Sequence, residues 1–478
     1  MNLLRVVGVL SLALLFIQFV ACVADESSKN DAIDANEDIS IVMDVEIYDA
    51  LLSDAEDIII EDILDVGYED LLDVSDLTQD ISLDVEQDIV EDVNSDEDIS
   101  YEDLSDSPFL DTGDIDMGFE DNTEIPDVGP IEDYDRYVVV SHPFGLDGST
   151  CGRDIEFLLF SKDGLLSRTD MRMDIGDCPV KVRFSPDGKF LFVILNNNHN
   201  PQAGTQSVVV LKKDLQGRFQ VLKEFAEFSG ENPEYIVFKR DGSKAFVVDF
   251  NIEGEGGIHI IKRENEDWIY EKEVMLALPK AMVILPDDRY AIIVGGKDPE
   301  DMAIMDIERE EIVAKIDIFS DFVDSLGLDV TSDGRYLVVP NSSPYSEIGN
   351  TLSIVEVDYS TDIPSLVLKQ IVSNINEPSA SLFTSDNKYL VVTNFSKNYT
   401  TLFYHENGNL VTLNKVTSMP LADTMTVLKR GDFKDYFFVN ALSDIHILKI
   451  ENSNLIRVQM LSLGDGYENM LGDIDIEP

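Results

Sequence analysis

The side chains best suited to acid–base or metal chemistry are few and scattered. The chain has five histidines, at His142, His199, His259, His405 and His446. No two of them stand four residues apart. No HExxH, GxSxG, phosphate-loop or dinucleotide-binding glycine motif occurs, so the sequence predicts no metal site and no catalytic constellation. His142 and His199 fall in predicted loops and are weak catalytic candidates, whereas the other three fall on predicted strands, where packing roles are expected.

A second set of polar residues stands at the ends of equivalent apolar strands, namely Asn196, Asp249, Asn341, Asn394 and Asn440. A ring of such side chains would suit a hydroxyl-rich ligand, a peptide or a cation. The same residue types are also common in ordinary turns. The expected partner is a protein, peptide or carbohydrate. We expect no cofactor, and Ca²⁺ has no supporting motif because residues 114–124 do not follow the EF-hand spacing.

A repeated sequence motif precedes the strands that position these residues. SPDGKFLFVI (185–194) returns as KRDGSKAFVVD (239–249), LPDDRYAIIVG (285–295), TSDGRYLVVPN (331–341) and TSDNKYLVVTN (384–394). In each copy an Asp-centred turn is followed by a run of aromatic and β-branched residues. Spacings of roughly 46 to 54 residues indicate a repeat architecture. Unbroken apolar runs indicate strands covered on both faces.

Each repeat contains four predicted antiparallel strands, which favours an all-β propeller with seven blades over residues 135–478. The sequence DRYVVVSH (135–142) resembles a second strand that lacks its first. The C-terminal IDIEP resembles a first strand that stops at its turn. We therefore predict that the C-terminal strand pairs with residues 136–141 and closes the ring. A monomer is expected.

Two cysteines fall in loops predicted on the same face of the propeller. Cys151 follows the second strand of the first blade, and Cys178 precedes the next blade. An exported protein permits disulfides, so we predict a Cys151–Cys178 bond. Two free buried thiols are the alternative.

The N-terminus has the pattern of an export signal. Arg5 precedes an apolar run that is short for a membrane span. Residues 1–22 end in FVAC, which resembles a bacterial lipoprotein signal with Cys22 as the lipidated residue, although Phe19 replaces the usual leucine. The expected location is the cell envelope, with a lipid anchor in the outer membrane or at the cell surface. The alternative is cleavage after Ala24 and a secreted or periplasmic protein.

Residues 23–134 form an acidic, low-complexity linker, which we expect to be a disordered stalk. Residues 25–135 hold 41 acidic side chains and one basic side chain, Lys29, within a chain of net charge −59. Such a segment repels itself and has little apolar surface to bury. The negative charge also repels phosphate, so nucleic acid is excluded as an expected partner.

The motifs SPDGKFLFV, SDGRYLVVPN and SDNKYLVVTN resemble YVTN-type propeller repeats and, more loosely, the seven-bladed lactonase family that includes 6-phosphogluconolactonases. That family commonly starts its first strands with Pro-Arg-His. Here the Arg and His positions hold Val180 and Lys181, Glu234 and Tyr235, or Ser379 and Ala380. The sequence therefore favours a non-enzymatic binding module, with a lactonase-like hydrolase as the alternative.

Overall fold

The computed structural model describes residues 135–145, 150–196, 206–228, 232–250, 256–295, 301–319, 325, 327–342, 350–464 and 469–478. The predicted signal, Cys22 and the acidic stalk lie outside these residues, as does His199. Within the described ranges, no helix has the length and apolar character needed to cross a membrane.

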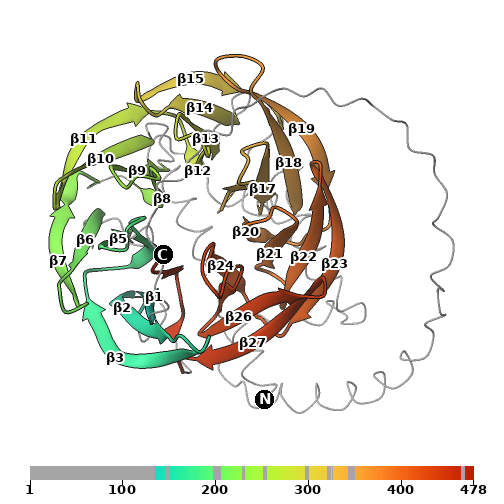
Figure 1. The fold of residues 1–478 in the computed structure, drawn as a ribbon. Coiled ribbons are helices and arrows are strands. Elements are labelled where there is room, and N and C mark those ends of the chain that lie inside the picture. The colour runs from blue at the N-terminus through green and yellow to red at the C-terminus, as the bar shows by residue number, and fades with distance from the viewer. Residues whose placement is uncertain are drawn as a thin grey trace, which may run out of the picture. The chain divides into compact units, whose positions relative to one another are not determined.

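The described strands form seven antiparallel sheets of four strands each, arranged as a ring (Figure 1). We number them blades 1 to 7 along the chain. Blade 1 consists of β28 (Ile474–Ile476), β1 (Arg136–Phe144), β2 (Cys151–Phe160) and β3 (Leu166–Asp174). Blade 2 consists of β4 (Pro179–Phe184), β5 (Phe190–Leu195), β6 (Ser207–Lys213) and β7 (Phe219–Phe225), followed by a 3-10 turn, η3 (Ala226–Phe228).

The next two blades continue the pattern. Blade 3 consists of β8 (Pro233–Phe238), β9 (Lys244–Asp249), β10 (Gly257–Glu264) and β11 (Asp267–Met275). Blade 4 consists of β12 (Pro279–Ile284), β13 (Tyr290–Gly295), β14 (Met302–Asp306) and β15 (Glu311–Ile316).

The last three blades complete the ring. Blade 5 consists of β16 (Asp329–Val330), β17 (Tyr336–Asn341), β18 (Thr351–Asp358) and β19 (Ser365–Val372). Blade 6 consists of β20 (Pro378–Phe383), β21 (Tyr389–Asn394), β22 (Tyr399–Glu406) and β23 (Asn409–Thr417). Blade 7 consists of β24 (Ala422–Val427), β25 (Phe437–Ala441), β26 (Asp444–Glu451) and β27 (Asn454–Ser462). The predicted seven-bladed propeller is confirmed.

The repeated turn joins the first two strands of a blade, as the sequence predicted. In blade 2 the Asp187 carboxylate accepts hydrogen bonds from the Ser185 hydroxyl and the Lys189 amide. Gly188 follows with φ +66°, a conformation that glycine adopts without a Cβ penalty. The strand after the turn, β5, is buried at every position because neighbouring blades cover both of its faces.

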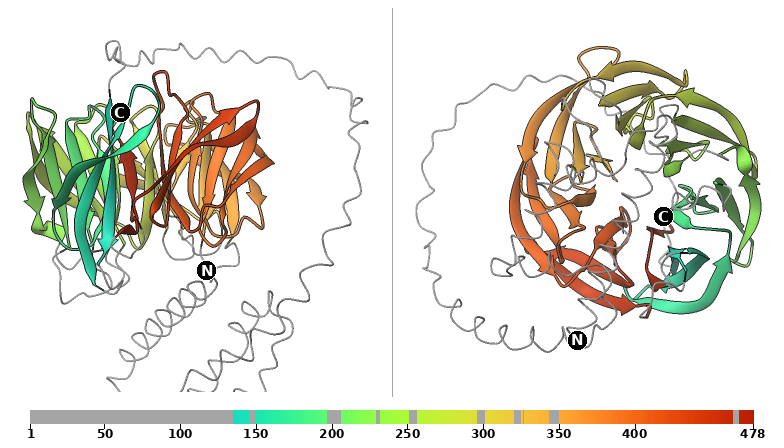
Figure 2. Two further views of the ribbon diagram at one scale, coloured as in Figure 1. Left: turned by 90° about the horizontal axis from the view of Figure 1, so that it is seen from below. Right: turned by 180° about the vertical axis from the view of Figure 1, so that it is seen from behind.

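The C-terminus closes the ring as predicted. β28 pairs with β1 in an antiparallel register that sets Ile476 opposite Val138 and Ile474 opposite Val140. Figure 2 shows the C-terminus within the ring, beside the blade that begins the propeller. The chain thereby pairs the exposed edge that β1 would otherwise present.

The predicted disulfide is also present and joins Cys151 to Cys178, with Cα atoms 4.8 Å apart. It ties the start of β2 to the residue before β4, and so connects blade 1 to blade 2. Trp268 lies in β11 and is fully buried against Phe192 and Phe238.

Candidate functional site

The innermost strands share a distortion at their N-terminal ends. The strand register shifts between Pro179 and Lys181 in β4 and between Pro233 and Tyr235 in β8. Equivalent shifts occur near the starts of β12, β20 and β24. A β-bulge of this kind changes the direction in which side chains point. In β4, β8, β20 and β24 the bulges occur where the strand begins to line a central cavity.

A cavity of about 370 Å³ lies between these inner strands. Its apolar wall includes Phe184, Ile236, Leu328, Leu382 and Met425. Its polar side chains are Lys181, Arg183, Tyr235, Ser379, Ser381, Asp423, Thr424, Thr426 and Asp473. A mostly apolar concave wall with a few convergent polar groups is the usual form of a small-molecule site.

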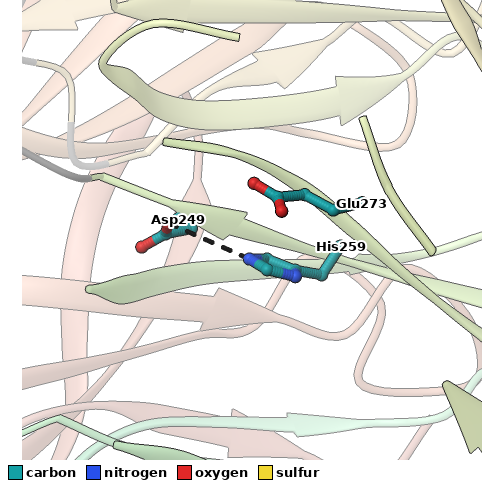
Figure 3. Close-up of side chains that lie close together, drawn as sticks. All are labelled: Asp249, His259 and Glu273. Carbon is teal, nitrogen blue, oxygen red and sulfur yellow. Dashed lines mark ion pairs between the residues drawn. The ribbon is translucent and has the colours of Figure 1, made fainter. Parts of the chain in front are cut away.

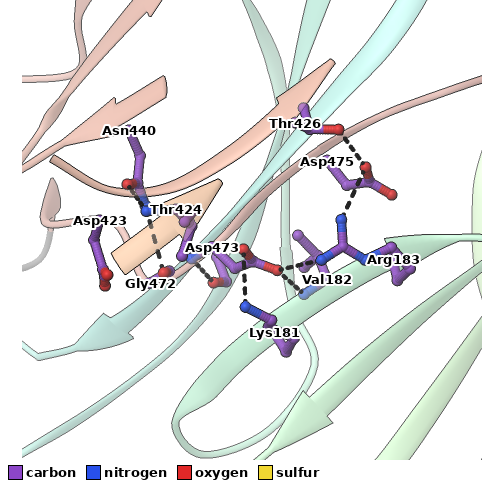
Figure 4. A network of polar contacts seen from close by, with 12 residues as sticks. Lys181, Val182, Arg183, Asp423, Thr424, Thr426, Asn440, Gly472, Asp473 and Asp475 are labelled. Atoms are coloured by element: carbon purple, nitrogen blue, oxygen red, sulfur yellow. Dashed lines mark hydrogen bonds and ion pairs between the residues drawn. The ribbon is translucent and has the colours of Figure 1, made fainter. Parts of the chain in front are cut away.

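One group of polar side chains joins the closing strand to blade 2 (Figure 4). The Asp473 carboxylate lies 3.5 Å from the Lys181 ammonium and accepts a hydrogen bond from the Val182 amide. The Asp475 carboxylate lies 3.3 Å from the Arg183 guanidinium and accepts a hydrogen bond from the Phe184 amide. These contacts cross from blade 1 to blade 2, so the last residues of the chain also build one side of the cavity.

The protonation equilibria of this group reflect competition between burial and charge. Burial disfavours a charged guanidinium, but the carboxylates of Asp475 and Asp473 outweigh it and raise the pKa of Arg183. Burial is the largest influence on Asp475 and raises its pKa despite Arg183. The ionisation of Arg183 and of Asp475 therefore depends on the charge of the other and on that of Asp473.

Asp423 and Ser379 form a second polar pair on the cavity wall. The Ser379 hydroxyl donates a hydrogen bond to the Asp423 carboxylate. Burial raises the pKa of Asp423, and the Ser379 hydrogen bond and the charge of Lys181 only partly offset that effect. A carboxyl group with a raised pKa on a cavity wall is a recognised mark of a functional site.

The five polar residues predicted to form a ring all lie at strand ends, but their side chains are buried. The Asn196 amide donates to the Pro233 carbonyl, and the Asn440 carbonyl accepts from the Thr424 amide. The Asn394 side chain likewise donates to the Ile375 carbonyl. These bonds hold neighbouring loops and strands together. Asp249 and Asn341 are buried in equivalent places, and ligand binding by the five residues stays a prediction.

The prediction that His142 lies in a loop is wrong. His142 lies within β1 and is fully buried, and its Nε2 is 3.4 Å from the Glu156 carboxylate. Burial disfavours the charged form of Glu156, but His142 and Arg168 together lower its pKa. The strand continues past the point where the sequence suggested a loop, because β1 and β2 remain paired as far as Phe144 and Cys151.

Sequence analysis missed the cavity residues Lys181, Ser379 and Asp423. The first two stand where the lactonase pattern has Arg or His, and their departure from that pattern argues against hydrolysis without predicting a cavity. Asp423 follows Ala422, at the position where β4, β8, β12 and β20 have proline, so the repeated motif did not identify it. The two positions after the strand-opening residue were the available signal, since Ser379 and Asp423 occupy the first of them and Lys181 occupies the second.

The fold places the chain in the class of seven-bladed β-propellers. No protein-family model and no curated protein matches this sequence. Similar solved structures are the periplasmic gluconolactonase PpgL of Pseudomonas aeruginosa, at 14% identity and TM-score 0.57, and a candidate 6-phosphogluconolactonase of Bacteroides uniformis, at 12% identity and TM-score 0.56. They cover 72% and 71% of this chain, and 99% of their own chains. At these identities the likeness shows the fold alone.

Proposed function

We propose that this propeller is a binding module whose ligand occupies the central cavity. The observation that carries the proposal is the convergence of Lys181, Ser379 and Asp423 on a cavity wall that combines apolar side chains with further polar groups. No histidine lines the described part of the cavity. The cavity thus offers donors and acceptors for recognition without the Arg and His that the lactonase pattern places at its strand starts.

The cavity chemistry favours a small hydroxyl-rich ligand such as a sugar or sugar acid. Lys181 offers a cationic donor, Asp423 an acceptor, and the Tyr235 ring a flat surface 5.3 Å from the Lys181 ammonium. Apolar side chains such as Ile236 and Leu382 complete the wall. Hydroxyl groups satisfy both donors and acceptors, and the C–H faces of a sugar pack on apolar and aromatic surface.

A ligand-observed NMR screen of sugars and sugar acids against the full chain tests this proposal. We expect at least one ligand to bind, and we expect Lys181→Met to weaken that binding about 10-fold or more by removing one charged hydrogen bond. Lys162→Met, at an exposed position in the turn between β2 and β3, is the matched control and should bind normally. Equal binding by the Lys181 and Lys162 variants would show that the ligand lies elsewhere.

A lactonase-like activity is the second candidate, favoured by the raised pKa of Asp423. In that reaction the Asp423 carboxylate would take a proton from water as the water oxygen attacks the lactone carbonyl. The ring C–O bond of the tetrahedral intermediate would then break, and the leaving oxygen would take the proton from Asp423. Lys181 would offset the charge on the carbonyl oxygen. Lactone hydrolysis that falls 100-fold or more in Asp423→Asn would establish it, whereas equal background rates in both proteins would reject it.

We further propose that the module is exported and tethered through Cys22, with residues 23–134 as its stalk. The support is the apolar run of the N-terminus and the FVAC motif. Labelling of cells with a palmitate analogue should mark the wild-type chain and not Cys22→Ala. Labelling that survives this substitution, or a wild-type chain found only as an unlabelled soluble protein, would contradict the tether.

A further inference from the structure

We propose that Asp249, His259 and Glu273 in blade 3 form a binding site for a divalent transition metal, with Zn²⁺ the best fit. The three residues come from three adjacent strands, β9, β10 and β11 (Figure 3). One ligand atom from each lies within 4.8 Å of the other two. This cluster lies outside the central cavity, since none of the three residues lines it.

Two buried polar atoms of this cluster lack hydrogen-bond partners among the described residues, whereas Asp249 Oδ1 accepts a hydrogen bond from the Asn232 amide. His259 Nε2 and Asp249 Oδ2 have no hydrogen-bond partner within the described part of the chain, although both side chains are at most 2% exposed. They face each other at 3.9 Å, which is too long for a hydrogen bond. Two ligands about 2.1 Å from one Zn²⁺ are separated by roughly 3–4 Å. The separation therefore suits a shared cation.

The surroundings prepare His259 to act as a ligand. The Tyr270 hydroxyl lies 3.1 Å from Nδ1, which leaves Nε2 directed at Asp249. The Phe228 ring packs against the imidazole with centroids 4.6 Å apart. A partner on the second ring nitrogen, as here, is what fixes the orientation of most metal-binding histidines.

Glu273 completes the set from the partly exposed outer strand. It stands directly opposite His259 in the β10–β11 pairing. Gly257 leaves room for its side chain, because a Cβ at that position would lie only 2.6 Å from Glu273 Oε1. One imidazole and two carboxylates match Zn²⁺ rather than Ca²⁺, which takes oxygen ligands. Three protein ligands leave a coordination position for water.

In two other blades, the positions equivalent to Asp249, His259 and Glu273 hold no set of metal-binding side chains. In blade 6 the equivalent pair is Asn394 and Thr401, joined by a 3.0 Å hydrogen bond, and the residue opposite Thr401 is Lys415. In blade 5 the pair is Asn341 and Ser353, opposite Ile371. Neutral side chains therefore occupy this position in both blades and bond each other in blade 6. Only blade 3, of these three, replaces them with an acid, an imidazole and a second acid.

The test is a Zn²⁺ titration of the full chain against a chromophoric chelator, in excess Mg²⁺ to occupy carboxylate-only sites of the acidic stalk. We expect one tight Zn²⁺ in the wild type. The double variant Asp249→Asn with His259→Thr recreates the neutral pair of blade 6, so it should fold, and it should lose this site with an affinity drop of at least about 100-fold. Glu273→Gln should weaken binding about 10- to 100-fold.

Cu²⁺ loading with electron paramagnetic resonance supplies an independent readout. Nitrogen hyperfine coupling from His259 should appear in the wild type and be lost in the double variant, whereas stalk carboxylates cannot produce it. The proposal is overturned if the wild type has no tight site, or if wild type and double variant bind the same number of ions with the same affinity and show the same coupling.

Discussion

His446 illustrates, at the scale of a single residue, how burial without partners makes stability depend on pH. It is fully buried in β26, and neither ring nitrogen has a hydrogen-bond partner among the described residues. Burial, together with the charge of Arg457, lowers its pKa to about 4. In the unfolded chain this histidine binds a proton below about pH 6.5, whereas in the folded chain it stays neutral down to about pH 4. Acid therefore favours unfolding between these two pH values.

Replacing His446 with leucine should remove this dependence. Between pH 7.5 and pH 5 the wild type should lose about 2 kcal/mol more of its free energy of unfolding than His446→Leu does. Urea unfolding at the two pH values measures the difference. His405→Leu is the control, because His405 bonds the Asn387 carbonyl and the Gly408 amide and its loss should destabilise at both pH values. Equal losses in wild type and His446→Leu would refute the assignment.

Asp423 makes stability depend on pH in the opposite direction. Its pKa in the folded chain is raised by burial, so its contribution to stability is fully present below the unfolded pKa and is lost as the pH rises through the folded pKa. Asp423→Asn keeps an acceptor for Ser379 and should raise the unfolding midpoint by about 2 °C at pH 7, with the gain vanishing near pH 4. A lower midpoint at pH 7 would mean that the carboxylate is required for folding.

At the scale of elements, β28 is a short strand with a large structural role. It pairs with β1 on one side, while the Asp473 and Asp475 carboxylates bond backbone amides of β4 in the next blade. Glu477 continues this pattern through an ion pair with Lys213. The strand therefore joins two blades as well as closing one.

Deletion of residues 471–478 should lower the free energy of unfolding by several kcal/mol, since it exposes the edge of β1 and leaves Lys181 and Arg183 buried without their carboxylates. Thermal unfolding of the full chain and of the deletion measures this. Removal of the exposed Pro478 alone is the control and should leave stability within about 0.5 kcal/mol. An unchanged midpoint in the longer deletion would contradict closure by β28.

At the scale of the whole molecule, the repeat pattern was enough to predict the seven blades, their closure and the Cys151–Cys178 bond. Those features follow from local signals, an Asp-centred turn beside an apolar run, repeated around a ring. The cavity was not predictable in this way. Lys181 and Asp473 are 292 residues apart, and only the bulges and the closing strand bring them together. The blade 3 cluster likewise depends on strand register, which spacing along the chain does not reveal.

The most direct test of the account is hydrogen exchange of the full chain, with and without the best ligand from the NMR screen. If the ligand occupies the central cavity, amides in β4, β20 and β24 should exchange more slowly when it is bound, while those in the outermost strands β7 and β23 should not change. Slower exchange confined to outer strands, or no change in any inner strand at saturation, would contradict the central claim that the ligand binds in the central cavity.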